Sequence, residues 1–188
     1  MRIVLLGMPG SGKGTQGTAL AEHFGVRHIS SGDLLRHHVL DGSELGRQVA
    51  AYLQRGEFVP DELVLAVVGD AVISAAQAGG YILDGFPRTR AQAERAFELA
   101  GPAGATADTV IYLEVPDDVA RARLTAREDA SRTDDGDPAV IERRLALFHD
   151  QTRPLLAYYD ERGILVTVDA DRPPDVVTQS IFAAMEPG

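Results

Sequence analysis

The feature that most constrains this chain is a glycine-rich loop placed between an apolar run and a helical pattern. Residues 3–6 are all apolar, which is typical of a strand buried on both faces of a parallel sheet. The loop that follows, residues 7–15, reads GMPGSGKGT and matches the pattern G-x-x-x-x-G-K. In such a loop backbone N–H groups turn inward, and the next helix adds the partial positive charge of its N-terminus. The sequence therefore predicts a phosphate site, with Lys13, the single lysine of the chain, reaching the phosphates.

Short apolar runs alternate with helical patterns along the whole chain. We expect strands over residues 3–6, 27–30, 80–83, 109–114 and 164–168. We expect helices over residues 13–24, 31–41, 43–54, 61–77, 89–100, 117–127, 138–161 and 174–185. This alternation predicts an α/β fold of the P-loop NTPase type, a three-layer α/β/α sandwich with a five-stranded parallel sheet. A length of 188 residues suits a single domain.

Composition excludes several classes of function. The chain has 18 basic and 28 acidic residues, a net charge of −10, which disfavours general binding to nucleic acids or to anionic membranes. It has no Cys, so disulfides and thiolate metal sites are excluded. No apolar run approaches the roughly 18 residues of a membrane span. We therefore expect a soluble, cytoplasmic protein that binds neither nucleic acids nor membranes.

Two further motifs follow the second and third expected strands. Residues 29–36 read ISSGDLLR, and residues 81–92 read YILDGFPRTRAQ. Asp84 stands at the carboxyl end of a buried strand, the edge of an α/β sheet where ligands bind, and a carboxylate there can order the water ligands of Mg²⁺. Arg88 offers a planar fork for two phosphate oxygens. The alternatives are a turn-capping Asp and a surface ion pair.

These motifs resemble the nucleoside monophosphate kinases, above all the adenylate kinases. The resemblance rests on GMPGSGKGTQ at residues 7–16 and on D-G-F-P-R at residues 84–88, with Gln92 four positions later, and it extends to about residue 184. It implies transfer of the γ-phosphoryl group of Mg·ATP to AMP, giving two ADP. It also implies that Thr15 and Asp84 act on the Mg²⁺ through water. Gly14 stands where the wider P-loop class has Ser or Thr, and this glycine is part of the string that resembles the adenylate kinases.

The resemblance also implies an acceptor site. Gln92 would read the adenine edge, Val59 would contact AMP through its backbone, and Leu53 and Val64 would line the base pocket, although apolar residues such as these are more often core. The AMP-binding residues so implied are Ser31, Arg36, Leu53, Glu57, Val59, Val64, Gly85, Arg88, Gln92, Arg132 and Arg144. Ser31 departs from the Thr that is common in the family.

Arginines cluster on both sides of a polar stretch at residues 128–137. By resemblance Arg123 packs on the ATP adenine, and Arg127, Arg132 and either Arg143 or Arg144 hold phosphates. Counting from the two sides of the stretch gives different registers, and we favour Arg144. The ATP-binding residues so implied are Gly10, Ser11, Gly12, Lys13, Gly14, Thr15, Arg123, Arg127 and Arg172. The catalytic residues so implied are Lys13, Arg88, Arg127, Arg132 and Arg144.

By the same resemblance the chain divides into a core and two insertions. The core would comprise residues 1–29, 60–127 and 139–188, with a helical acceptor-binding segment at 30–59 and a short lid at 128–138. So short a lid leaves no room for a structural zinc site, and the family precedent is a monomer. Two alternatives stay open: a kinase for UMP or CMP, and a regulatory module that binds nucleotides without turnover.

Overall fold

The computed structural model describes residues 1–126 and 137–185 of the chain. Its strands form one parallel sheet, in the order β2-β3-β1-β4-β5. The bounds are β1 Arg2–Leu6, β2 Arg27–Ser30, β3 Tyr81–Asp84, β4 Thr109–Glu114 and β5 Leu165–Asp169. These positions agree with the expected strands to within one residue, and the predicted α/β fold is confirmed.

The register aligns the carboxyl ends of three strands. Leu5 of β1 pairs with Asp84 of β3, and Asp84 pairs in turn with Ser30 of β2. The chain order reverses beside β1, because β3 lies on one side of it and β4 on the other. In open α/β sheets a ligand binds at such a reversal, outside the carboxyl ends of the strands. The topology therefore brings together the loop after β1, the start of the helix after β2 and the turn after β3.

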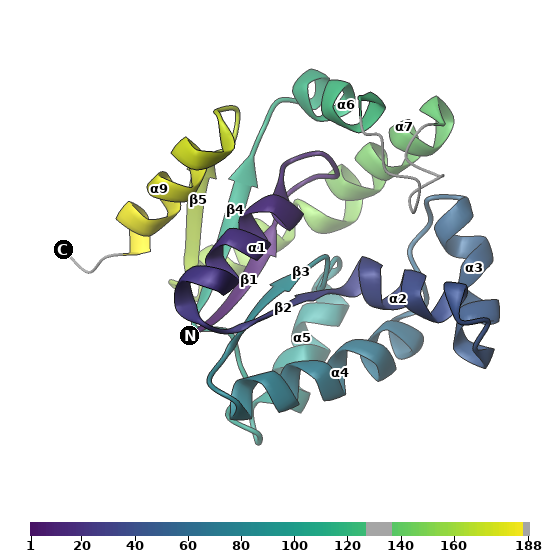
Figure 1. Cartoon of the computed structure of the whole chain (residues 1–188), viewed down its shortest axis with the longest axis horizontal. Coiled ribbons are helices and arrows are strands. Elements are labelled where there is room, and N and C mark those ends of the chain that lie inside the picture. The colour runs from purple at the N-terminus through teal and green to yellow at the C-terminus, as the bar shows by residue number, and fades with distance from the viewer. Residues whose placement is uncertain (127–136, 186–188) are drawn as a thin grey trace.

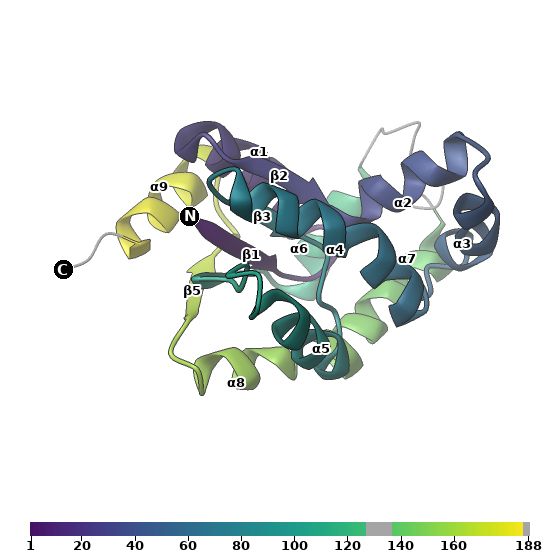
Figure 2. The same ribbon diagram turned by 90° about the horizontal axis from the view of Figure 1, so that it is seen from below.

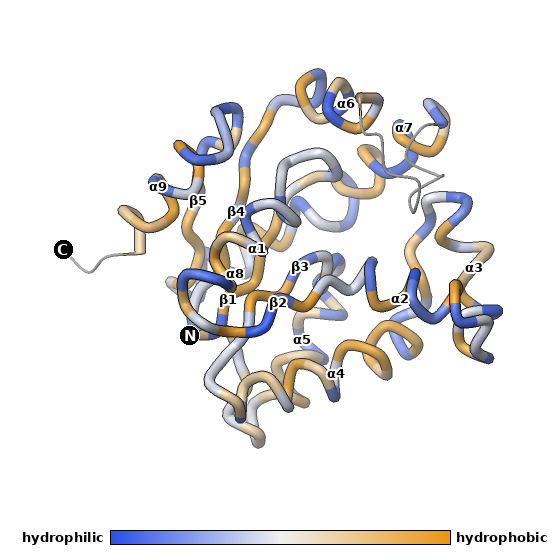
Figure 3. The backbone as a smooth tube through the Cα atoms, in the orientation of Figure 1, coloured by the Kyte–Doolittle hydropathy of each residue, from blue (hydrophilic) through white to orange (hydrophobic). Residues whose placement is uncertain are grey.

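Helices cover both faces of the sheet, as Figure 2 shows from below. Helices α1 (Lys13–Phe24) and α9 (Pro174–Met185) contact each other on one face. Helices α4 (Asp61–Gln77), α5 (Arg90–Ala100) and α8 (Leu155–Asp160) lie on the other face. The orange colour of Figure 3 runs along α4 and the inner strands, and the inner strands carry several of the fully buried side chains. They include Ile3, Leu5, Ile82, Ile111 and Leu113.

Two short helices extend from the sheet toward one end of the molecule in Figure 1. They are α2 (Ser31–Leu40) and α3 (Glu44–Gln54), which pack against each other. Ser30 accepts a hydrogen bond from the N–H of Asp33 and Ser43 from the N–H of Gly46, so each helix begins behind a serine cap. Within the described residues no helix is long and apolar enough to cross a membrane.

The expected helix over residues 138–161 is wrong, because the structure divides it into three parts. These are α7 (Pro138–Leu147), a π-helical turn (Phe148–Thr152) and α8. Pro154 has no N–H to donate, so a regular α-helix cannot continue through it. The expected helix over 117–127 is α6, Asp117–Thr125, and its last expected residue lies outside the described part of the chain.

Candidate active site

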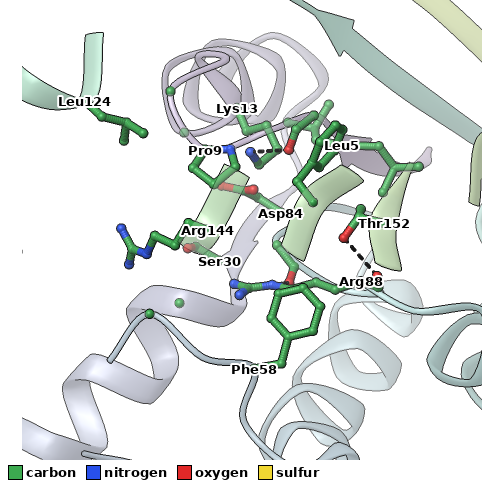
Figure 4. Close-up of a pocket in the computed structure, with 18 of the residues that line it drawn as sticks. Leu5, Pro9, Lys13, Ser30, Phe58, Asp84, Arg88, Leu124, Arg144 and Thr152 are labelled. Carbon is green, nitrogen blue, oxygen red and sulfur yellow. Dashed lines mark hydrogen bonds between the residues drawn. The ribbon is translucent and has the colours of Figure 1, made fainter. Parts of the chain in front are cut away.

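Two cavities lie over the carboxyl edge of the sheet. The larger has a volume of about 160 Å³ and is lined by the loop after β1, α2, the turn after β3 and α7. The smaller, of about 20 Å³, lies between α2, α3, the start of α4 and Gln92. Five residues line both cavities, so the two spaces adjoin; they are Leu53, Glu57, Phe58, Gly85 and Arg88. Figure 4 shows Lys13, Asp84, Arg88 and Arg144 around the larger one.

The phosphate loop forms as predicted between β1 and α1. Gly10 and Gly12 have φ values of 85° and 94°, which L side chains rarely adopt. A Cβ on Gly10 would stand 2.5 Å from the carbonyl oxygen of Ala120, so the loop also needs glycine there to pack against α6. Lys13 Nζ donates to the carbonyl oxygens of Gly7 and Met8 at 2.8 and 2.9 Å. The loop thus holds its lysine at the larger cavity.

A carboxylate and an arginine face this loop from β3 and the turn after it. Asp84 is only 8% exposed and lines the larger cavity. Arg88 Nε donates to the carbonyl oxygen of Gly85 at 2.6 Å, and its guanidinium lies 5.4 Å from the ring centre of Phe58. Burial lowers the pKa of Arg88 from 12.5 to about 10, because the charged form loses hydration. The Asp84 carboxylate opposes this shift.

Two more arginines join Arg88 at the larger cavity. Arg36 of α2 forms an ion pair with Asp33, and Arg144 extends from α7. Both cations lower the pKa of Arg88 further, so three positive charges lie within electrostatic reach of one another. A cluster of like charges is costly unless an anion binds among them. The cavity is therefore built for a strongly negative ligand.

The structure separates the two arginines between which the register was open. Arg144 lines the larger cavity. Arg143 donates instead to the carbonyl oxygen of Arg55 at 3.2 Å and lies 3.5 Å from a carboxylate oxygen of Glu57. Arg144 is thus the one placed to meet a ligand, while Arg143 links α7 to the turn after α3.

The smaller cavity collects the residues expected at the acceptor base. Ser31, Leu53, Val59, Val64 and Gln92 all line it. The Ser31 hydroxyl is buried without a hydrogen-bond partner in the described part of the chain, which suits a ligand that supplies one. A Cβ on Gly85 would stand 2.7 Å from that hydroxyl, so glycine is required at this turn, where φ is 80°.

The residues expected at the donor base lie apart from both cavities. Arg123 donates to the carbonyl oxygen of Ala170 at 3.0 Å, and Arg172 donates to Asp169 at 3.0 Å. Ser11 and Thr15 belong to the loop but line neither cavity; Ser11 is buried and Thr15 is exposed. Arg127 and Arg132 lie outside the described residues.

The structure adds two residues that the sequence analysis missed. Phe58 lies beneath the Arg88 guanidinium, and the Thr152 hydroxyl donates to the Arg88 carbonyl oxygen at 2.9 Å. The sequence signal for Phe58 is its place between two expected site residues. Thr152 has no such signal, because the π-helical turn brings it to the site.

The donor set at the cavity suits a magnesium ion that arrives with a nucleotide. Among the described residues no group of three His, Asp or Glu side chains is arranged to hold a metal ion. Mg²⁺ keeps several waters and is commonly held by one or two carboxylates plus substrate phosphates. The buried carboxylate of Asp84, in the same cavity as the phosphate loop, fits that pattern.

Comparison with known proteins agrees with this geometry. The family model described as adenylate kinase matches residues 5–164. Proteins named adenylate kinase from Synechococcus sp. (strain WH7803) and Thermobifida fusca (strain YX) are 44% and 39% identical to this chain. The match to the Synechococcus protein covers 98% of this chain and 98% of that protein. The match to the Thermobifida fusca protein covers 99% of this chain and 98% of that protein. Because the matches span the phosphate loop, the D-G-F-P-R turn and nearly all of the rest, the chain belongs to the adenylate kinase family.

Proposed function

We propose that the protein transfers the γ-phosphoryl group of ATP to AMP, giving two ADP, and catalyses the reverse reaction. The observation that carries this proposal is that one cavity, the larger of the two, is lined both by the phosphate loop and by Arg36, Arg88 and Arg144. Two anionic phosphate groups that must meet can enter such a cavity from opposite sides. The names of the relatives support the same reaction.

In this reaction the residues position phosphates and neutralise charge. Lys13 and the loop N–H groups bind the β- and γ-phosphates of ATP, while Arg36 and Arg88 bind the phosphate of AMP. Arg144 contacts the group in transfer. Phosphoryl transfer needs little covalent help from the protein, and its rate depends on alignment and on charge stabilisation. No general base is required, because the attacking phosphate oxygen of AMP is already an anion.

The base pockets follow from the same assignment. The adenine of AMP enters the smaller cavity, where Gln92 reads its edge and Leu53, Val59 and Val64 enclose it. The adenine of ATP packs on the Arg123 side chain, next to the backbone at Ala170, to which Arg123 donates a hydrogen bond. Arg172 flanks this place. Arg127 and Arg132, from outside the described residues, complete the phosphate contacts in this proposal.

Mg²⁺ binds with ATP, held through water by Asp84 and Thr15. When bound, the ion neutralises charge on the β- and γ-phosphates. We also assign residues 30–59 as the acceptor segment and residues 128–138 as a short lid over a core of residues 1–29, 60–127 and 139–188. A site built from one chain is consistent with a monomer, and we propose that the protein acts as a monomer in the cytoplasm.

The test is diphosphate formation by the purified protein with Mg·ATP and AMP, UMP, CMP or GMP in turn. We expect turnover with AMP, at least about a hundredfold above the other acceptors, since an unpaired polar group in a base pocket costs that much or more. A preference for UMP or CMP would overturn the assignment of AMP as the acceptor. ATP binding without turnover on any acceptor would favour a regulatory module.

A further inference from the structure

The side-chain amide of Gln92 forms hydrogen bonds with two partners, one a donor and the other an acceptor. Its oxygen accepts the backbone N–H of Arg88 at 2.7 Å. Its nitrogen donates to a carboxylate oxygen of Asp61 at 2.6 Å. The side chain is 2% exposed, and the Thr89 hydroxyl caps the helix at the Gln92 N–H at 3.1 Å. The amide is therefore fixed in place without any ligand.

Only one orientation of this amide satisfies both partners. A carboxylate only accepts hydrogen bonds, and a backbone N–H only donates. A rotation by half a turn would bring the Gln92 oxygen against the Asp61 carboxylate and the NH₂ group against the Arg88 N–H. Both contacts would be repulsive inside a buried site, where an unmade hydrogen bond is expensive.

The fixed amide leaves one N–H and one oxygen lone pair for a ligand in the smaller cavity, which Gln92 lines. The Watson–Crick edge of adenine offers an amino donor at N6 and an acceptor at N1. The N6 amino group can donate to the Gln92 oxygen, and N1 can accept from the Gln92 N–H. Hypoxanthine has the reverse order, an acceptor at O6 and a donor at N1, and it is otherwise the same size and shape. An amide that cannot rotate can pair with the first base and not with the second.

We infer that Asp61, which lines neither cavity, sets the choice of acceptor base by fixing the orientation of the Gln92 amide. Asp61 is a positioning residue that acts through Gln92. It excludes the 6-oxopurines because they could pair only with a rotated Gln92 amide, and the Asp61 carboxylate disfavours that rotation. The two residues are 31 positions apart and come from α4 and α5. This inference rests on the proposed function, because it assumes that the acceptor base occupies the smaller cavity.

A purely structural role for Asp61 makes a different prediction. Asp61 and Glu62 are the acidic residues in the first turn of α4, behind Pro60, which provides no side-chain cap. Negative charge there stabilises a helix through its dipole. Loss of that effect would weaken the binding of every acceptor alike. Base discrimination separates the two roles, because only an orienting residue changes the ratio between two bases.

The experiment compares AMP with inosine monophosphate in the wild type and in Asp61→Asn. Dissociation constants come from calorimetry, and kcat and KM from diphosphate formation with Mg·ATP. An asparagine can turn its own amide to meet either orientation of Gln92, while the Arg88 N–H still favours the original one. We therefore expect the AMP preference to fall by about tenfold, the equivalent of one hydrogen bond. The change should be in KM and Kd, with kcat for AMP nearly unchanged.

Two variants serve as controls. Glu62→Gln removes the same charge from the same helical turn and has no contact with Gln92 among the described bonds, so its AMP preference should match the wild type. Asp61→Glu keeps a carboxylate and should keep most of the preference.

An unchanged AMP preference in Asp61→Asn overturns the inference, and so does an equal loss in Glu62→Gln. Equal binding of the two monophosphates by the wild type overturns it as well. The binding measurement stands without turnover: a wild type that prefers AMP in binding but forms no ADP refutes the proposed reaction and leaves the test of Asp61 intact.

Discussion

Replacing Arg88 by Met should stabilise the folded protein without ligand while abolishing turnover. The guanidinium lies in a cavity with two other arginines, and its pKa falls from 12.5 to about 10 through burial. A tenfold change in an acidity constant is about 1.4 kcal/mol, so burying this charge costs at most about 3 kcal/mol. The side chain is only partly buried, so its remaining exposure to solvent reduces that cost.

The interactions that the substitution removes offset part of the gain. The hydrogen bond from Nε to the carbonyl oxygen of Gly85 contributes about 1 kcal/mol, and the contact with the Phe58 ring about 0.5–1 kcal/mol. Methionine has a similar length and no charge. We expect a net stabilisation of about 1 kcal/mol, which for a chain of this size raises the melting temperature by about 2–4 °C.

The pH dependence of this gain has a definite sign. A cation whose pKa is lowered by folding destabilises the folded state at every pH below that pKa. The cost shrinks only as the pH rises through about 10, where the folded form begins to release the proton. The difference in stability between Arg88→Met and the wild type should therefore be constant from about pH 6 to pH 9.

The assay is thermal or urea unfolding with and without AMP, together with the rate of diphosphate formation. The wild type should gain stability from AMP and the variant should not, and kcat/KM should fall by at least about a thousandfold. Arg90→Met is the matched control, because Arg90 is exposed and pairs with Glu94 at 2.8 Å; its stability should change by less than about 0.5 kcal/mol. A ligand-free Arg88→Met protein less stable than the wild type by 1 kcal/mol or more would refute this reasoning.

Three other substitutions test separate parts of the structure. Gly85→Ala should lower the free energy of unfolding by about 1–3 kcal/mol, visible in urea unfolding, because φ is 80° and the new Cβ would meet a buried hydroxyl at 2.7 Å. Arg144→Ala should reduce kcat at least about a hundredfold and Arg143→Ala less than about tenfold, since Arg144 faces the cavity; comparable losses in steady-state assays would contradict that placement. Asp108→Asn should cost at most about 1 kcal/mol at pH 7, because the bond to Arg2 lowers the pKa of Asp108. In pH-dependent unfolding that stabilisation is present above the usual Asp pKa and should disappear as the pH falls through the lowered one.

Local patterns in the sequence determine the elements and the chemistry of their ends. The apolar run of residues 3–6, the glycines after it and Lys13 are contiguous, so the strand, the loop and its phosphate site follow from neighbours along the chain. Asp84 and Arg88 lie within one contiguous strand-to-turn motif, so their place at the end of a strand also follows from neighbours along the chain. The alternation of short strands and helices then predicts a parallel sheet.

Only the tertiary structure decides which distant residues meet. Adjacent helical residues point about 100° apart, so a shift of one position in a loop exchanges Arg143 and Arg144 at the cavity, and no local pattern fixes that shift. The π-helical turn just before Pro154 brings Thr152 to Arg88, and the packing of the helices on either side of this turn decides where Thr152 lies. The hydrogen bond between Asp61 and Gln92 joins the first turns of α4 and α5. These two turns are distant in the sequence and meet only because both helices pack on the same face of the sheet. Contacts of this kind depend on packing between elements, which residue types and their spacing do not specify.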